Sequence, residues 1–383
     1  MKEIYLDNSA TTYVRSDVLE YMTPYFEINY GNPSSLYNLG LKNRKCINEC
    51  RQDIARLFNC TSSKEIYFTS CGTESNNWAL KSACMQKKRG HIIVSAIEHS
   101  SILESSYFLR KLGYDVTYLS VDVNGIVSLK ELEKSIRKDT ILVSIMYVNN
   151  EIGVIEPIKD IASICKKYNI LLHTDAIQAV PHMKINVQEL GIDMMSVSGH
   201  KVYGPKGIGF LYVKKNTPLI PFIHGGHQEN GMRGGTENTA NIIGLTKGLE
   251  LCDKELEENT AKFKKLRNRL IHGLSMLNYN YIEVCSDINN KVDSILNICF
   301  ENVNSKILEI LLSEKNIYVS TGSACNSGIV AASHVLQALN ISNDYINGAL
   351  RISLGKDTSE EDIDILIETL RSIFNNKLSF IQI

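Results

Sequence analysis

The chain has 383 residues, and its 41 Lys and Arg side chains nearly balance its 42 Asp and Glu side chains. This balance provides no basic field that would attract nucleic acid, and the apolar runs fall far short of the ~20 residues that a membrane helix needs. Residues 1–7 lack the apolar core of a signal peptide, and the ten cysteines form neither a CxxC pair nor a Cys/His cluster at zinc spacing. We therefore expect a cytoplasmic protein with no metal site, no membrane anchor and no direct nucleic-acid partner.

From residue 66 onward, short apolar runs alternate with stretches that carry apolar residues at helical spacing. Because the strands are apolar throughout, this alternation predicts a mainly parallel sheet with helices on both faces. Only a glycine-rich turn separates the last two strands, so the last strand is predicted to be antiparallel. Ligands of such sheets bind beyond the carboxyl ends of the strands. The expected strands are 66–69, 92–95, 116–119, 141–146, 170–173, 194–197 and 208–213, and the expected helices are 75–87, 101–112, 129–137 and 158–168.

The remaining sequence predicts a second, smaller region that begins with a long amphipathic helix at 259–277. The N-terminal segment is expected to join this region. We therefore predict an α/β fold with a large domain of residues 15–258 and a small α+β domain of residues 1–14 and 259–383. The other expected elements of the small domain are strands at 295–300, 317–320 and 351–354, a helix at 305–314 and a terminal helix from Glu360.

Two polar motifs end neighbouring strands of the large domain. Ser198-Gly199-His200-Lys201 follows one strand, where a charged lysine is costly because desolvation lowers the pKa of an ammonium group. That cost suits an amine that attacks a carbonyl and forms a Schiff base. Asp175 ends the preceding strand, where a carboxylate is able to pair with a protonated pyridine nitrogen. Each motif alone has a plainer explanation, namely a solvated lysine in a turn and an aspartate that caps a helix.

With these motifs one strand apart, the chain resembles the cysteine desulfurases. These are the NifS/IscS-like members of the class V aminotransferase group among the fold-type I pyridoxal phosphate enzymes. The resemblance extends from Tyr5-Leu6-Asp7-Asn8-Ser9-Ala10-Thr11-Thr12 to Arg351-Ile352-Ser353-Leu354-Gly355, which is nearly the whole chain. It implies the fold-type I PLP-dependent transferase architecture, pyridoxal 5'-phosphate as the cofactor, L-cysteine as the substrate and a homodimer.

The resemblance also implies the residues of a cofactor site. Lys201 would hold the cofactor, Asp175 would face its pyridine nitrogen, and His99 would stack on the ring and carry protons together with the lysine. Thr236 would reach the phosphate in the neighbouring subunit, although a helix cap is an alternative role for it. Thr73 opens a helix, where N–H groups and a hydroxyl favour phosphate, and a plain cap explains it equally well. The full expected set is Gly72, Thr73, His99, Asn150, Asp175, Gln178, Ser198, His200, Lys201 and Thr236.

Three further residues are expected, by the same resemblance, to bind the substrate carboxylate: Asn32, Asn150 and Arg351. A guanidinium fork matches a carboxylate, whereas a structural ion pair is the plainer explanation for Arg351. The sequence departs from the family at Tyr37, where His is usual, and at Cys71, where Gly is usual.

Cys325 is the expected nucleophile. It lies in Thr321-Gly322-Ser323-Ala324-Cys325-Asn326-Ser327-Gly328, a small polar loop that is an unusual place for a cysteine. On the resemblance, its thiol attacks the sulfur of the substrate. The segment Ser333-His334-Val335-Leu336 that follows is typical of the family, but the Glu-Pro that commonly precedes it is missing.

Together these residues predict a cysteine desulfurase that converts L-cysteine to L-alanine. The sulfur would pass as a persulfide on Cys325 to an acceptor protein of iron–sulfur cluster assembly or tRNA thiolation. A selenocysteine lyase, which shares the fold and the cofactor, is the alternative. A sulfur carrier without catalysis would need none of Lys201, Asp175 and His99, and an aminotransferase would not need a thiol on a loop.

Overall fold

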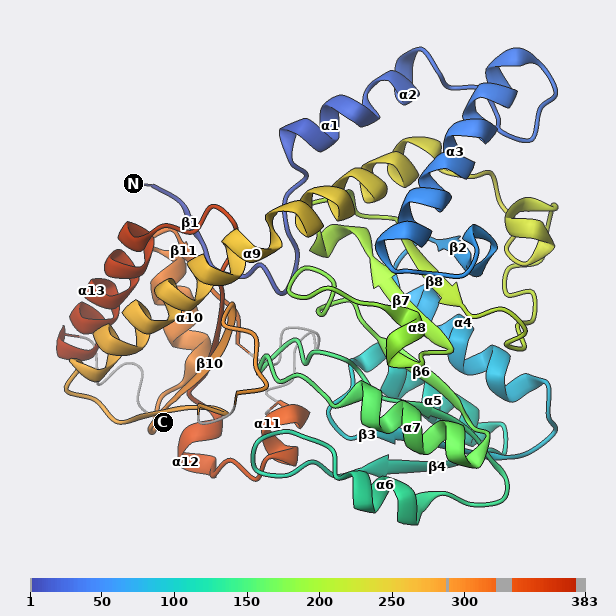
Figure 1. The fold of residues 1–383 in the computed structure, drawn as a ribbon. Helices are drawn as coiled ribbons and strands as arrows, with labels where there is room; N and C mark the ends of the chain where they lie inside the picture. Colours follow the sequence, from blue (N-terminus) through green and yellow to red (C-terminus); the bar gives the residue numbers. More distant parts are fainter. Residues whose placement is uncertain (1, 287–288, 322–332, 377–383) are drawn as a thin grey trace.

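The computed structural model describes residues 2–286, 289–321 and 333–376. Its largest sheet has seven strands in the order β2-β8-β7-β6-β5-β3-β4, with helices on both faces (Figure 1). Strands β3 to β7 pair in parallel, and β8 pairs antiparallel with both of its neighbours. The predictions of a mainly parallel sheet and an antiparallel last strand are confirmed. The strands are β2 Ile66–Thr69, β3 His91–Ser95, β4 Asp115–Leu119, β5 Thr140–Ser144, β6 Leu171–Asp175, β7 Met194–Ser198 and β8 Gly209–Val213.

Each face of the large sheet has its own hydrophobic core. Ile92 and Val94 of β3 pack with apolar residues of α4 and α5, whereas Ile93 packs on the opposite face with residues of α3 and α7. This division follows from the period of two in a strand, which sends successive side chains to opposite faces. Helix α4 begins at Gly72, three residues before the expected start, so Thr73 lies in its first turn. The helices of this region are α1 Ser16–Met22, α2 Pro24–Glu27, α3 Asn38–Leu57, α4 Gly72–Met85, α5 Ser100–Lys111, α6 Leu129–Ser135, α7 Ile158–Tyr168 and α8 Val187–Leu190.

A second, antiparallel sheet of order β12-β10-β9 has a separate core, which α10 and α13 help to cover. Strand β1 pairs in parallel with β11 in a separate two-stranded sheet, and Ile4 and Leu6 pack in the core of the smaller sheet. In Figure 1 the smaller sheet and its helices lie to one side of the large sheet. The elements are β1 Ile4–Tyr5, β9 Tyr281–Glu283, β10 Ile295–Phe300, β11 Ile317–Tyr318, β12 Ala349–Ser353, α10 Ser305–Ser313, α11 His334–Ala338, α12 Asn343–Ile346 and α13 Glu360–Asn376.

Helix α9, Thr239–Ser275, is a single helix of 37 residues that contacts both cores. Leu249 packs in the core of the large sheet, and Leu270 packs in the core of the small sheet. The expected start at residue 259 is wrong because residues 253–258 are mostly strong helix formers, and the buried Leu256 continues the packed side of the helix between Cys252 and Phe263. The cap of α9 is Asn238, whose side chain accepts a hydrogen bond from the backbone N–H of Asn241. The alternative role of Thr236 as this cap is therefore wrong.

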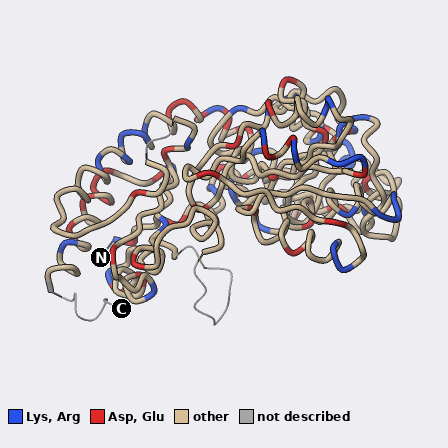
Figure 2. Tube along the Cα trace, turned by 90° about the horizontal axis from the view of Figure 1, so that it is seen from below, with Lys and Arg blue, Asp and Glu red and all other residues tan. Residues whose placement is uncertain are grey.

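The charges of both signs are mixed along the described chain, as Figure 2 shows for Lys and Arg beside Asp and Glu. Among the described helices, none combines the length and the apolar composition that crossing a bilayer requires. Nor do three His, Cys, Asp or Glu side chains gather as a metal-binding group within the described part of the chain.

The buried His173 predicts a pH dependence of stability. Its ring nitrogens lie 2.8 Å from Ser144 Oγ and 2.9 Å from Ser196 Oγ, and burial lowers its pKa to about 3. Between that value and the ordinary 6.5 the unfolded chain binds more protons, so the free energy of unfolding is expected to fall as the pH drops through this window. Burial also lowers the pKa values of His182 and His200 to about 4, which adds to the effect.

Urea unfolding at several pH values between 7.5 and 4.5 measures this dependence. The slope of the unfolding free energy against pH should reach about 1.4 kcal/mol per pH unit for each buried histidine. The slope of His173→Asn should be smaller than that of the parent. His272→Asn is the control because His272 is exposed in the last turn of α9. An unchanged slope in His173→Asn would show that His173 is not among the titrating groups.

Candidate active site

Three of the expected residues meet at one edge of the large sheet. Asp175 ends β6, and Lys201 lies in a short 3-10 helix, Gly199–Lys201, that directly follows the neighbouring strand β7. The two strands are parallel, so their carboxyl ends lie at the same edge. His99 follows β3 and caps α5 at this edge. Hydrogen bonds through Asn76 and Ser101 connect Asp175 to His99, so His99 lies at the same edge as Asp175 and Lys201.

Lys201 is held by the N-terminal segment. Its Nζ donates to the carbonyl oxygen of Ala10 at 2.8 Å and to that of Ser9. Gln178 Nε2 donates to the same Ser9 carbonyl at 2.7 Å. The amine of Lys201 and the amide of Gln178 therefore share one acceptor.

Asp175 is buried and firmly held, with 4% of its surface exposed. Oδ1 accepts a hydrogen bond from the backbone N–H of Ile177 at 3.0 Å, and Oδ2 accepts one from Asn76 Nδ2 at 2.7 Å. The first bond is of the kind a capping residue makes. The second comes from the side chain of another element, so the carboxylate is fixed more tightly than a cap requires.

Two imidazoles flank the lysine, and both are neutral near pH 7. Burial lowers the pKa of His99, against the opposing effect of Asp175. Burial, with the nearby Lys201, lowers the pKa of His200 to about 4. His99 Nδ1 accepts a hydrogen bond from the backbone N–H of Ser101 at 3.1 Å, and His200 Nδ1 lies 3.1 Å from Thr11 Oγ1. A neutral imidazole keeps one proton to give and one lone pair to receive another.

The start of α4 forms the side of the site that suits a phosphate. Gly72 packs so closely that a Cβ at this position would lie 2.1 Å from Ile177 Cδ1 and 3.4 Å from Ser198 Cβ. The hydroxyl of Ser198 is buried and has no hydrogen-bond partner among the described residues. Thr73, in the first turn of α4, is exposed. Unpaired N–H groups of a helix start and free hydroxyls are the donors that a phosphate accepts.

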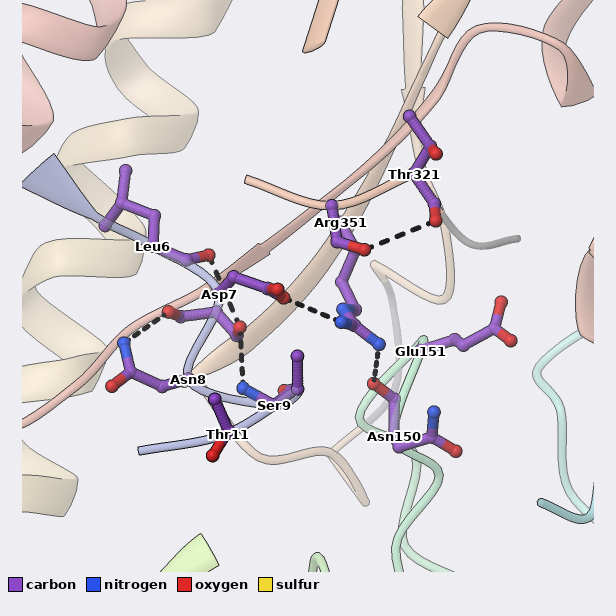
Figure 3. A network of polar contacts seen from close by, with 12 residues as sticks. Leu6, Asp7, Asn8, Ser9, Thr11, Asn150, Glu151, Thr321 and Arg351 are labelled. Carbon is purple, nitrogen blue, oxygen red and sulfur yellow. Dashed lines mark hydrogen bonds and ion pairs between the residues drawn. The ribbon is translucent and has the colours of Figure 1, made fainter. Parts of the chain in front are cut away.

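Arg351 lies on β12, and its guanidinium lies beside the turn that carries Asn150 (Figure 3). Arg351 Nη2 pairs with Asp7 Oδ1 at 2.7 Å, and Nη1 donates to the Asn150 carbonyl oxygen at 3.3 Å. Its Nε–H is buried without a partner among the described residues. Arg351 thus forms a structural ion pair with Asp7, which was the alternative to substrate binding. Its Nε–H is still available as a hydrogen-bond donor.

Removing the Asp7 carboxylate is expected to destabilise the fold. The side chains of Arg351 and Asp7 are only 7% and 19% exposed, so Asp7→Ala leaves a buried guanidinium without its counter-charge. We expect a loss of about 2–4 kcal/mol in the free energy of unfolding, measured by urea titration. Asp253→Ala, at an exposed position of α9, should change it by less than about 0.5 kcal/mol. Equal effects of the two substitutions would contradict the importance of the pair.

Asn32 and Thr236 lie elsewhere. Both line a surface groove with Tyr25, Tyr30 and Ala240, and the described lining of this groove includes none of Lys201, Asp175 and His99. Asn32 and Thr236 therefore lie near each other and away from Lys201 of the same chain.

Cys325 lies outside the described residues, but the chain on either side of residues 322–332 is tied to the site. On the entering side, the backbone N–H of Arg351 donates to the Ser320 carbonyl oxygen at 2.6 Å. On the leaving side, Ser333 Oγ donates to Glu151 Oε2 at 2.5 Å, and His334 Nε2 donates to the Glu98 carbonyl oxygen at 2.9 Å. Burial raises the pKa of the Glu151 carboxyl.

The family model described as Aminotransferase class-V matches residues 4–366. The chain belongs to the class-V aminotransferase family. A curated relative from Clostridium botulinum, Cysteine desulfurase IscS, is 44% identical over 379 residues, which are 98% of this chain and 95% of the relative. A solved structure described as a NifS-like protein is 38% identical, has a TM-score of 0.92, and matches over 99% of this chain and 100% of its own. A second one, described as SspA in complex with cysteine, is 38% identical with a TM-score of 0.82, over 92% of this chain and 99% of its own.

Class-V aminotransferases of this kind depend on pyridoxal phosphate, and this chain has the groups that the cofactor requires. A partly buried amine, a fixed carboxylate and a neutral imidazole meet at one sheet edge. The unpartnered hydroxyl of Ser198 and the start of α4 supply donors for the phosphate. The residues present therefore fit the cofactor.

The sequence analysis missed several residues that complete this class-V aminotransferase site. Asp7 stands within the Tyr5 to Thr12 motif, but the resemblance gives it no role, and no motif named above contains Glu151, Asn76 or Ser101. Asn76 offered one clue, because an amide between apolar residues on the buried face of α4 needs a hydrogen-bond partner. The identity of that partner depends on the tertiary structure.

Proposed function

We propose that this protein is a pyridoxal phosphate-dependent cysteine desulfurase. It converts L-cysteine to L-alanine and holds the sulfur as a persulfide on Cys325. The observation that carries the proposal is the meeting of Lys201, Asp175 and His99 at one sheet edge in a chain that matches a named cysteine desulfurase over 98% of its length. Selenocysteine lyase is not favoured, because the curated relative and a cysteine-bound structure both point to the sulfur amino acid.

When bound, pyridoxal phosphate supplies an electron sink for the pair released from the Cα–H bond of the substrate. Lys201 would hold the cofactor through its amine, and its Nζ would accept and return protons. Asp175 would favour a protonated pyridine nitrogen by its negative charge. His99 carries a proton on Nε2, since its Nδ1 already accepts the Ser101 N–H.

Arg351 and the asparagines are proposed to bind the substrate carboxylate. The unused Nε–H of Arg351 is a donor that is already buried, so it gains a partner when a carboxylate arrives. Cys325 then attacks the substrate sulfur, forming an S–S bond as the Cβ–S bond breaks. L-Cysteine and one enzyme thiol give L-alanine and one enzyme persulfide, so no external oxidant or reductant is needed.

We further propose a homodimer in which Thr236 reaches the cofactor of the partner subunit. Large apolar side chains crowd an exposed stretch beside the groove that Thr236 lines, among them Ile28 at 68% and Tyr30 at 71% exposure. Exposed apolar patches of this kind favour an interface. We also propose a large domain of residues 15–258 and a small domain of residues 1–14 and 259–383. The proposed sulfur acceptors are proteins of iron–sulfur cluster assembly or tRNA thiolation, and the proposed location is the cytoplasm.

The test is incubation of the purified protein with L-cysteine, followed by mass spectrometry of the products and of the protein. We expect L-alanine to form and a peptide containing Cys325 to gain the mass of one sulfur atom. Formation of pyruvate without alanine, or sulfur bound only at other thiols, would contradict the proposal.

A further inference from the structure

Asn76 links two of the proposed site residues to each other. It lies on α4, is fully buried at 0% exposure, and is three residues beyond Thr73. Its Nδ2 lies 2.7 Å from Asp175 Oδ2 and 2.8 Å from Ser101 Oγ. Ser101 Oγ in turn lies 2.8 Å from His99 Nδ1. One continuous row of hydrogen bonds therefore joins the carboxylate at the end of β6 to the imidazole at the start of α5.

The donors and acceptors in this row have only one consistent arrangement. A carboxylate is an acceptor, so Asn76 must turn its NH₂ group toward Asp175. The second N–H of the same group then donates to Ser101 Oγ, which leaves the Ser101 hydroxyl proton for His99 Nδ1. The backbone N–H of Ser101 donates to Nδ1 as well, at 3.1 Å. His99 Nδ1 is therefore an acceptor, and the imidazole proton lies on Nε2.

We propose that Asn76 is a positioning residue that holds the Asp175 carboxylate in place with one N–H and, through Ser101, fixes the proton of His99 on Nε2 with the other. The proposed function gives different tasks to the two ends of the row. Asp175 retains a proton on the cofactor ring, and His99 moves protons. Only that statement of tasks rests on the proposed function, because the hydrogen bonds belong to the chain itself.

A purely structural role explains Asn76 less well. Its Oδ1 is buried and has no partner among the described residues, and an unpaired buried carbonyl is costly. An apolar side chain would fill the same space without that cost. The NH₂ group of Asn76 makes both of its hydrogen bonds to groups of the site. Asn76 therefore costs some stability but holds Asp175 and His99 in place.

The charged and titratable groups near His99 come from three other elements. Asp175 from β6 favours its protonated form, whereas Lys201 after β7 and His334 of α11 disfavour it. Burial lowers the pKa of His99 as well. The hydrogen bond that the Ser101 hydroxyl donates to Nδ1 also lowers the pKa of His99, since a donor at Nδ1 opposes protonation there.

The experiment compares Asn76→Ala and Ser101→Ala with the parent, using the full-length protein. Nitrogen NMR of ¹⁵N-histidine-labelled protein, without pyridoxal phosphate and assigned with His99→Gln, reports the pKa and the protonated nitrogen of His99. Titration of the cofactor-free protein with pyridoxal phosphate, followed by visible absorbance, reports the Kd. Asn77→Ala and Ser105→Ala are the controls, because Asn77 donates to Thr73 on its own helix and Ser105 donates to the Ser101 carbonyl oxygen.

Both Asn76→Ala and Ser101→Ala should raise the pKa of His99, by about 0.5 to 1 unit. Only Asn76→Ala should also weaken pyridoxal phosphate binding, by about tenfold or more, because only it removes a donor from Asp175. An unchanged His99 pKa in both variants, or an equal change in the controls, overturns the proposal. Because Ser101→Ala removes only a hydroxyl, it keeps the test decisive if Asn76→Ala does not fold. The His99 measurement needs no cofactor, so its outcome is independent of whether the proposed function is correct.

Discussion

The Lys201→Ala variant is expected to form L-alanine from L-cysteine at least about a thousandfold more slowly than the parent. The physical reason is the position of the amine: Lys201 ends the 3-10 helix that follows β7, and its Nζ donates to the carbonyl oxygens of Ser9 and Ala10 at the edge where Asp175 ends β6. Borohydride treatment of the parent should attach the cofactor irreversibly to Lys201. Mass spectrometry of the digested protein locates that attachment.

Lys206→Ala is the matched control, because Lys206 lies five residues later and is exposed. It should retain the parental rate and the borohydride-stable attachment at Lys201. If Lys201→Ala kept more than about a tenth of the activity, or if the cofactor were attached to another lysine, the assignment of Lys201 would be wrong.

The Cys325→Ala variant is expected to keep the absorbance of the bound cofactor and to form no persulfide. L-Alanine formation should fall about a hundredfold or more, because no thiolate is present to receive the sulfur. The contrast between intact cofactor absorbance and lost sulfur transfer separates this result from unfolding. Visible spectra, alanine assay and mass measurement of the protein check the three parts of the prediction.

Cys46→Ala is the control for this experiment. The thiol of Cys50, followed by the hydroxyl of Tyr25, lowers the pKa of Cys46 to about 6, whereas burial raises the pKa of Cys60 to about 12. Since a lower thiol pKa favours reaction, Cys46 is the better competitor for sulfur of these two cysteines. Persulfide found on Cys46 in the parent, and lost with Cys46→Ala, would transfer the proposed role away from Cys325.

The large sheet could be predicted from the sequence because its elements are local patterns. Each strand is a continuous apolar run, each helix has its own apolar spacing, and the parallel arrangement follows from their alternation. Asp175 and Lys201 were found for the same reason, since both stand at the ends of such runs. Their meeting follows from one general rule, that neighbouring parallel strands end at one edge.

The partners of these residues could not be predicted, because their contacts join distant parts of the chain. Asn76 meets Asp175 across 99 residues, and Asp7 meets Arg351 across 344. No periodicity of the sequence carries that information. The continuity of α9 was missed for a different reason, since residues 253–262 contain a single large apolar residue, Leu256, which is too few to indicate a packed helix face.

Helix α9 has a mechanical consequence for the whole molecule. With 37 residues it is about 55 Å long, and its two ends are anchored in different hydrophobic cores. The proposed boundary at residue 258 falls inside this helix, so the two parts of the chain share one continuous helix whose first half packs in the large core and whose second half packs in the small core. Relative rotation of the two sheets must bend or twist the helix, which limits how far the edge carrying Lys201 can part from the strand carrying Arg351.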